Sequence, residues 1–210
     1  MSSPKDLQIY FLPIIAPGHL LPMLDMALSF SHHTPNISLL IPPSSSSLLP
    51  PLLPSPLRLI VLETDTPSPS PSTPASSVSA ASLEATLTSL FDPLRRRPPF
   101  CLVFDMFLPF AAECARARNV PSLVFHGTSF FSLCVSERIA FTIECASARD
   151  DDDNRPFVVP GLPDSIVLRP SQVPRASAAP LVKRLRQSNA LSYGAVFNSF
   201  YVLEPTYAEH

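Results

Sequence analysis

The sequence predicts an α/β fold in which a doubly wound parallel sheet carries helices on both of its faces. Short apolar runs rich in β-forming residues recur along the chain, and stretches with a helical spacing of apolar residues separate them. Two of these runs, at 7–15 and 122–126, are followed by a glycine and then by a helical stretch. Strands that alternate with helices in this way are typical of a parallel sheet with helical crossovers.

The first strand and the first helix are predicted at 7–15 and 20–31. The run at 7–15 is apolar almost throughout, as expected for a strand buried on both faces of a parallel sheet. Gly18 and His19 follow it, and the next residues place leucines on one stripe of a helix. Pro22 would lie in the first turn of that helix, where its missing N–H group costs no hydrogen bond.

The rest of the chain repeats this alternation. Ser82 is predicted to cap the N-terminus of the second helix, because its hydroxyl can accept a hydrogen bond from an unpaired backbone amide. The predicted strands after the first lie at 37–41, 57–63, 100–105, 122–126 and 194–199. The predicted helices after the first lie at 82–94, 110–118 and 129–146.

Residues 1–210 are predicted to form one domain, which suits a chain of this length. Pro and Ser dominate the region 42–82 apart from its one strand, which predicts a mobile surface loop. The acidic run 150–153 is interpreted as a second solvated loop, because adjacent carboxylates rarely converge on one metal ion. The basic cluster 95–97 is interpreted as cations at a helix C-terminus.

Composition excludes several classes of function. The net charge is −2, so there is no basic field for a nucleic acid and no polybasic run for an anionic membrane surface. No apolar stretch reaches the length of a membrane span. The cysteines are widely spaced and form no C-x-x-C pair, so we expect buried thiols in a reducing compartment, with neither a zinc site nor a disulfide framework. These features favour a cytoplasmic protein.

Two residues at predicted strand ends are candidates for catalysis. In a doubly wound sheet the ligand crevice lies beyond the C-terminal ends of the strands. His19 follows the first strand, and Asp105 ends the strand 100–105. A histidine there is either a general base, oriented by a carboxylate at its other nitrogen, or a capping or packing residue. Asp105 is likewise either that carboxylate or a structural cap.

The absence of glycine-containing motifs disfavours several cofactor sites and one class of enzyme. The chain has only four glycines, at 18, 127, 161 and 194. No G-x-G-x-x-G follows the first strand and no P-loop is present, which disfavours nicotinamide, flavin and nucleoside-triphosphate sites. No G-x-S-x-G occurs either, which disfavours a serine hydrolase.

Five segments together resemble the plant UDP-dependent glycosyltransferases that act on small molecules. They follow the family's order along nearly the whole chain, and lie at 17–27, 101–111, 121–134, 159–163 and 198–205. The resemblance implies the N-terminal, Rossmann-like domain of a GT-B glycosyltransferase, which holds the acceptor. The C-terminal domain of that family holds most of the UDP-sugar, which is a co-substrate, and the family needs no cofactor and no metal.

The resemblance also implies roles for individual residues. His19 would deprotonate an acceptor hydroxyl, with Asp105 orienting the imidazole, and the sugar would be transferred with inversion. Acceptors would be flavonoids, phenolics or terpenoids. Further residues would lie near the donor phosphates or the acceptor: Gly18, Thr128 and Ser129. Others would form an apolar acceptor wall or, equally, plain core: Phe107, Phe125, His126 and Phe131.

The sequence departs from the family pattern in two ways. It ends at His210, before the family's second domain, and it contains no tryptophan and so lacks the Trp- and Gly-rich donor box. The region 42–99 is also shorter and richer in Pro and Ser than the family pattern. We therefore expect the isolated chain to transfer sugar poorly or not at all. The alternative is a non-catalytic binding or interaction module that associates through an exposed apolar cleft face.

Overall fold

The computed structural model describes residues 7–34, 36–42, 57–62, 80–92, 98–145, 155–173 and 179–210. These residues form two compact units. The first comprises residues up to Gly127 together with Gln187–Val196, and the second comprises Thr128–Arg186 together with Phe197–His210. The sequence did not distinguish these units, and the single domain over 1–210 stays a prediction.

The first unit contains the predicted parallel sheet. Its strand order is β3-β2-β1-β4-β5-β8, and the β1–β2, β1–β4, β2–β3 and β4–β5 pairs are all parallel. Each of the six strands lies within or at the bounds predicted for it, so the fold class is confirmed. The strands are β1 (Ile9–Leu12), β2 (Ile37–Ile41), β3 (Arg58–Val61), β4 (Cys101–Asp105), β5 (Ser122–His126) and β8 (Gly194–Phe197).

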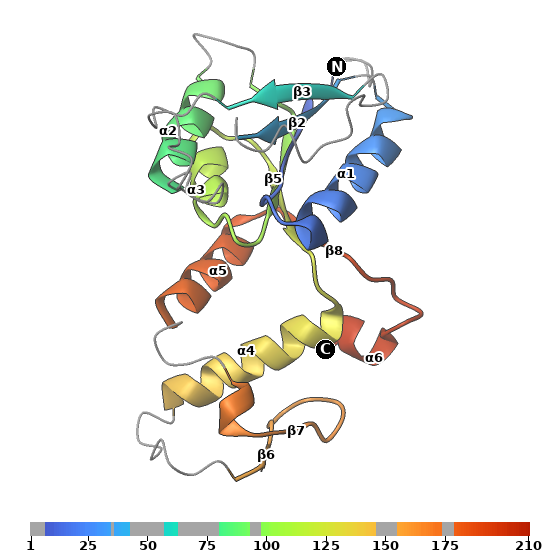
Figure 1. Cartoon of the computed structure of the whole chain (residues 1–210), viewed down its shortest axis with the longest axis vertical. Coiled ribbons are helices and arrows are strands. Elements are labelled where there is room, and N and C mark those ends of the chain that lie inside the picture. The colour runs from blue at the N-terminus through green and yellow to red at the C-terminus, as the bar shows by residue number, and fades with distance from the viewer. Residues whose placement is uncertain are drawn as a thin grey trace, which may run out of the picture. The chain divides into compact units, whose positions relative to one another are not determined.

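Helices cover both faces of this sheet, and each face has its own core. The side chains of β1 alternate between the cores: Tyr10 and Leu12 belong to one, and Phe11 belongs to the other. The Phe11 core includes Leu20, Met23 and Leu24 of α1 (Pro17–Ser31), whereas the Tyr10 core is completed by α2 (Ala80–Leu90) and α3 (Phe110–Ala117). Figure 1 accordingly shows α1 on one side of the sheet and α2 and α3 on the other.

Two predictions about where helices start were wrong. The first helix begins at Pro17, three residues before the predicted start, so Pro22 lies inside it and beyond the first turn. An amide at position 22 would donate to the Gly18 carbonyl, so Pro22 costs the helix a hydrogen bond. Ser82 lies within α2, which already includes Ala80, and therefore does not cap it.

The second unit is built around the long helix α4 (Phe130–Cys145), which the sequence predicts within one residue at each end. Other elements of this part of the chain are not predicted by the sequence, because two-residue strands have no periodicity and basic residues interrupt the apolar stripe of α5. They are β6 (Phe157–Val158), antiparallel to β7 (Val167–Leu168), a 3₁₀ turn (Pro170–Gln172), α5 (Ala179–Leu191) and α6 (Pro205–Ala208). The α5 helix starts in the second unit and ends in the first.

Several predicted features lie outside the described residues. These are nearly all of the Pro/Ser-rich region 42–82, the basic cluster 95–97 and the acidic run 150–153. Within the described part of the chain, no helix has the length and apolar character needed to cross a bilayer. The same residues contain no cluster of three or more metal-ligating side chains. Of the cysteines whose side chains the structure describes, Cys101, Cys114 and Cys134 are free thiols; Cys114 is buried and the other two are partly exposed.

Candidate functional site

The strand order of the first unit puts a topological switch point between β1 and β4. From β1 the chain proceeds outward to β2 and β3, and from β4 it proceeds in the other direction to β5 and β8. In register, Leu12 at the end of β1 pairs with Phe104, which immediately precedes Asp105. Ligands of open parallel sheets bind at such a point, beyond the carboxyl ends of the strands.

His19 reaches this point as the third residue of α1. Ala16 is the N-cap, and its carbonyl accepts hydrogen bonds from the amides of His19 at 2.9 Å and Leu20 at 2.8 Å. No side chain caps this helix. Because α1 already begins at Pro17, shortly after β1 ends at Leu12, the His19 side chain is held on a rigid element and not on a loop.

His19 and Asp105 form a hydrogen-bonded pair in which the imidazole Nδ1 lies 2.7 Å from the carboxylate Oδ2. The His19 side chain is 21% exposed, whereas the Asp105 side chain is completely buried. The two residues are 86 positions apart in the sequence, and adjacent parallel strands bring them together. The pairing predicted from their strand-end positions is therefore present.

The buried carboxylate is held from both strands. The Phe107 amide donates to Oδ1 at 3.0 Å, and the Ile14 amide, just beyond β1, also donates to the carboxylate. Burial raises the pKa of the Asp105 carboxyl above its ordinary value, because desolvation outweighs the opposing effects of Phe107, His19 and Ile14. The hydrogen bonds thus hold the ionised carboxylate in one orientation. Loss of one of these partners would leave a buried charge unsatisfied, which costs free energy.

This geometry assigns different tasks to the two imidazole nitrogens. An ionised carboxylate only accepts hydrogen bonds, so the short contact places a proton on Nδ1 of His19. In the neutral imidazole the lone pair is then on Nε2, which can accept a proton from a substrate hydroxyl. Asp105 also stabilises the imidazolium that this transfer would produce.

Gly127, which follows β5, lies close to the His19 ring. A Cβ atom at position 127 would be 3.1 Å from His19 Nδ1 and 3.3 Å from Cε1. These distances are shorter than ordinary van der Waals contacts, so the glycine allows the imidazole its position. In contrast, a Cβ atom at Gly18 would have no neighbour within 4 Å. Space next to Gly18 is therefore open to a ligand.

This contrast predicts different outcomes for two alanine substitutions. We expect Gly127→Ala to displace the His19 ring and to lower the free energy of unfolding by about 1–3 kcal/mol, the usual cost of overpacking. Gly18→Ala should leave stability unchanged or raise it by less than about 1 kcal/mol, because alanine is the better helix former. Chemical denaturation and ¹⁵N NMR of His19 would measure both effects. An undisturbed His19 spectrum in Gly127→Ala would contradict the steric role of this glycine.

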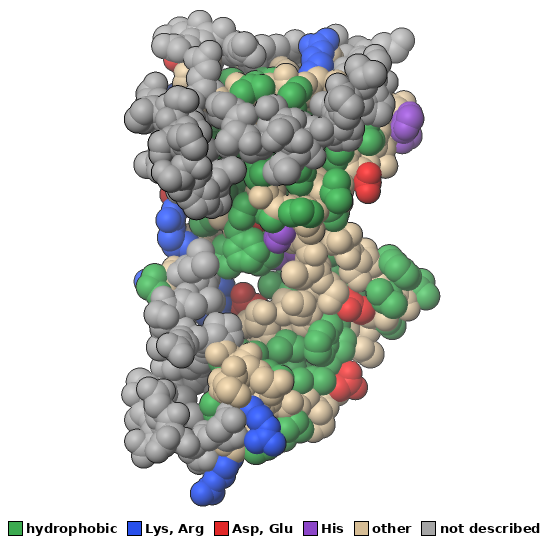
Figure 2. Space-filling view, viewed as in Figure 1, with side chains coloured by type: hydrophobic (Ala, Val, Ile, Leu, Met, Phe, Trp, Pro, Cys, Tyr) green, Lys and Arg blue, Asp and Glu red, His purple; other side chains and the backbone are tan. Residues whose placement is uncertain are grey.

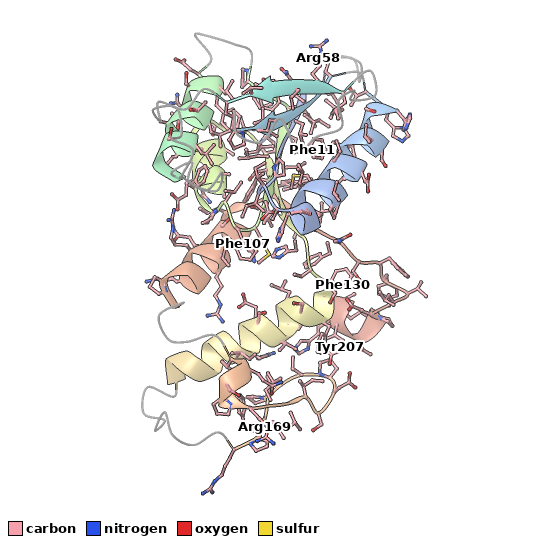
Figure 3. The ribbon with its side chains drawn as sticks, in the orientation of Figure 1. Phe11, Arg58, Phe107, Phe130, Arg169 and Tyr207 are labelled. Carbon is pink, nitrogen blue, oxygen red and sulfur yellow. The ribbon has the colours of Figure 1, made fainter. Side chains whose placement is uncertain are left out.

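The aromatic candidates of the first unit differ in how accessible they are. The Phe107 side chain, which is labelled in Figure 3, lies edge-on to His19, with ring centroids 5.4 Å apart and planes at 62°, and it is 40% exposed. His126 is only 1% exposed. Burial lowers the pKa of its imidazole, and a hydrogen bond with Asn189 opposes that shift. Phe125 belongs to the Phe11 core. Of these residues, Phe107 is the one that lies exposed next to His19, and its participation in acceptor binding stays a prediction.

The remaining candidates, Thr128, Ser129 and Phe131, belong to the second unit. Thr128 is exposed. The Ser129 hydroxyl accepts a hydrogen bond from the Ser132 amide at 3.3 Å and also bonds to Glu204. Phe131 is partly exposed. Their participation in substrate binding stays a prediction.

Sequence reasoning missed three contributors to these arrangements. Nothing in the sequence marks the Ile14 amide or Asn189. Glu204 lies in one of the segments that carry the family resemblance, 198–205, but nothing in the sequence links its carboxylate to the start of α4. A carboxylate can be matched to the start of a helix 74 residues earlier only once the fold is known.

Comparison with known proteins places these features in a family context. No profile of a known protein family matches the chain. The scopoletin glucosyltransferase of Nicotiana tabacum is 32% identical to it, over 98% of this chain and 48% of that protein. The UDP-glucose flavonoid 3-O-glucosyltransferase 7 of Fragaria ananassa is also 32% identical, over 98% of this chain and 45% of that protein. The chain thus spans about half the length of the curated relatives it matches.

Solved structures that are similar to this chain are also plant UGTs, and the chain again covers about half of each. The UGT of Glycyrrhiza uralensis complexed with glycyrrhetinic acid 3-O-monoglucuronide superimposes with a TM-score of 0.74 and 26% identity, over 97% of this chain and 46% of that chain. The Phytolacca americana UGT2 complexed with UDP-2fluoro-glucose and pterostilbene has a TM-score of 0.67 at 22% identity, covering 100% of this chain and 51% of that chain. The second likeness concerns the fold alone.

Proposed function

We propose that this chain, which belongs to the plant UDP-dependent glycosyltransferase family, supplies the acceptor-binding and proton-accepting half of a sugar transferase with the GT-B fold. The observation that carries the proposal is the His19–Asp105 pair, which lies at the switch point of the sheet with a nitrogen-to-oxygen distance of 2.7 Å. A buried, oriented carboxylate behind an imidazole is the arrangement that general-base catalysis needs.

In the proposed reaction, His19 Nε2 takes the proton of an acceptor hydroxyl as that oxygen attacks the anomeric carbon of a UDP-sugar. The bond from the anomeric carbon to the UDP oxygen breaks, UDP leaves with the electron pair, and the configuration at that carbon inverts. Asp105 keeps the Nδ1 proton in place and balances the positive charge on the imidazolium. The UDP-sugar is a co-substrate, and this scheme requires neither a cofactor nor a metal ion.

The acceptor is proposed to be a small molecule with a hydroxyl on an apolar framework. The curated relatives include enzymes named for scopoletin, a flavonoid and abscisate. In this chain the half-exposed Phe107 ring next to His19 offers an apolar surface at the reacting hydroxyl. Gly18 leaves open space close to the same histidine. We propose that most contacts with UDP come from the C-terminal half of the enzyme, and that the protein acts in the cytosol.

A non-catalytic binding or interaction module is the second candidate function. One feature favours it: four consecutive apolar side chains in the second unit are exposed (Figure 2). These are Phe200, Tyr201, Val202 and Leu203. Exposed apolar patches mark sites of association. Under this alternative, the chain binds acceptors or intact relatives without turnover.

The two functions are separated by one pair of measurements. Titration calorimetry with scopoletin tests acceptor binding by the 210-residue chain, and a UDP-release assay with UDP-glucose tests turnover. We expect binding without turnover for the chain alone, and turnover once the second half of a relative is fused to it. Absence of turnover in a folded fusion would favour the non-catalytic module.

A further inference from the structure

The turn that follows β4 is anchored on both sides of Phe107. The Met106 amide donates to the Phe125 carbonyl at 2.9 Å, which extends the pairing between β4 and β5. The Leu108 amide donates to the Asp105 carbonyl at 2.9 Å, and the Leu108 side chain is buried in the core that α2 and α3 complete. Phe107 therefore lies between two anchored residues, and its backbone is held in place.

Phe107 contacts both members of the His19–Asp105 pair. Its amide donates to Asp105 Oδ1 at 3.0 Å, so the carboxylate closes an Asx turn with the residue two positions later. Its ring lies edge-on to the His19 imidazole, with centroids 5.4 Å apart, which is a favoured geometry for aromatic pairs. One residue thus holds the carboxylate through its backbone and the imidazole through its side chain.

The hydrogen bond to Asp105 does not by itself orient the whole imidazole. That bond holds Nδ1 of His19, 2.7 Å from the carboxylate oxygen, whereas Nε2 shifts whenever the ring tilts about this contact. Gly127 lies close to Nδ1 and Cε1 and limits the tilt there. The Phe107 ring supplies a further contact with the imidazole. The direction in which Nε2 points therefore depends on packing as well as on the hydrogen bond.

The surroundings of Phe107 separate this contact from ordinary core packing. Among the described side chains of the first unit, Phe107 is in neither of the two cores, and its ring is partly exposed. The ring therefore contributes little to the burial that stabilises the sheet. Its removal should disturb His19 without unfolding the first unit.

We infer that Phe107 is a positioning residue for the base: its amide orients the Asp105 carboxylate, and its ring orients the His19 imidazole and so directs Nε2. This inference rests on the proposed function, in which Nε2 accepts the proton of the acceptor hydroxyl. It differs from the role of an acceptor wall. A residue that only binds the acceptor changes KM, whereas a residue that orients the base changes kcat at saturating acceptor.

The test follows the His19 imidazole by ¹⁵N NMR in the 210-residue chain at mildly alkaline pH, with Phe107→Ala, Phe107→Leu and Phe107→Tyr. The backbone amide is kept in each variant, so these substitutions test the ring alone. Leucine keeps apolar bulk without the ring and decides the matter if the alanine variant folds poorly, whereas tyrosine keeps the ring. The matched control is Phe100→Ala, because Phe100 is an exposed phenylalanine at the opposite end of β4.

Kinetics with UDP-glucose and scopoletin are measured on the same variants fused to the second half of the tobacco scopoletin glucosyltransferase. We expect the ratio of Nε2-protonated to Nδ1-protonated His19 to rise about two- to tenfold in Phe107→Ala and Phe107→Leu, the usual strength of an aromatic contact. The kcat of these two fusions should fall by a similar factor. Phe107→Tyr should keep the wild-type His19 spectrum, and Phe100→Ala should change neither the spectrum nor kcat.

An unchanged His19 spectrum in both variants without the ring would overturn the inference and leave the proposed function intact. A higher KM with unchanged kcat would overturn it as well, since the ring would then serve the acceptor alone. A folded wild-type fusion without turnover would instead refute the proposed function, and this inference with it.

Discussion

Replacing His19 with alanine is expected to lower the rate of UDP release by about 10²–10⁴-fold, the usual contribution of a general base. The enzyme for this test is the chain fused to the second half of the tobacco scopoletin glucosyltransferase, with UDP-glucose and scopoletin as substrates. The reason is geometric: Nδ1 of His19 is bound to Asp105, so Nε2 is left to accept the hydroxyl proton. Affinity for scopoletin should change far less than the rate, because the imidazole acts on the transition state.

His19→Gln and His32→Ala are the controls for this prediction. Glutamine can still donate a hydrogen bond to Asp105 but cannot accept a proton at neutral pH, so His19→Gln should be as inactive as His19→Ala. His32 caps the other end of α1 and is exposed, so His32→Ala should retain full activity. Activity of His19→Gln close to that of the wild-type fusion would show that another group accepts the proton.

Asp105→Asn is expected to abolish most activity while leaving the fold at least as stable at neutral pH. The asparagine oxygen can still accept the Phe107 amide, but its NH₂ group would donate to His19 Nδ1 and drive the proton to Nε2. An imidazole protonated at Nε2 cannot act as a base toward the acceptor. The same exchange behind a catalytic histidine of a serine protease costs roughly 10⁴-fold in kcat, and we expect a loss of that order.

The stability part of this prediction has a definite pH dependence. Burial raises the folded-state pKa of Asp105 above its unfolded value, so the folded chain binds the proton more tightly than the unfolded chain. Ionisation of Asp105 therefore lowers the free energy of unfolding as the pH rises from the unfolded pKa, near 3.8, through the folded pKa. Asp105→Asn lacks this loss. Its melting temperature relative to the wild type should be highest near pH 7 and should fall as the pH approaches 4.

Thermal melts of the 210-residue wild-type and Asp105→Asn chains between pH 4 and pH 7 would measure this dependence. The matched control is Asp92→Asn, because Asp92 lies just beyond α2 and is not part of the His19 pair. A melting temperature of Asp105→Asn that falls below the wild type as the pH rises would mean that the carboxylate contributes net stability. Asp105 would then serve mainly to stabilise the fold, and its catalytic role would be secondary.

The elements that sequence reasoning predicted correctly are those with long, regular patterns. The strands of the sheet are continuous apolar runs, because both faces of a parallel sheet are covered by helices, and such runs stand out in the sequence. The errors concern helix starts, short elements and α5, whose apolar stripe is interrupted by basic residues. The sequence predicts that α1 starts after Pro17 and Gly18, since a glycine next to a proline is typical of a turn, although both residues are helical in the structure. The β6–β7 pair has two residues in each strand and no pattern to detect.

In the candidate site, too, the sequence reveals some features and leaves others to the tertiary structure. His19 and Asp105 were found because each stands at the end of a recognisable strand and because parallel strands bring such ends to one edge. His126 ends β5 in the same way, but the structure buries it beside Asn189. Strand-end position alone does not separate the two histidines, because the difference lies in which way each side chain is turned and in what packs over it.

By itself, then, the sequence determined the six strands of the parallel sheet, the first four helices, and the two residues that could work as a base and its partner. Hydrophobic periodicity encodes which segments are buried, and this information is local. Only the tertiary structure decided that the Ile14 and Phe107 amides hold Asp105 from two strands, that Gly127 gives the His19 ring its space, and that Glu204 caps a helix 74 residues away. These contacts join residues distant in sequence and depend on distances of a few ångströms, which no pattern along a chain records.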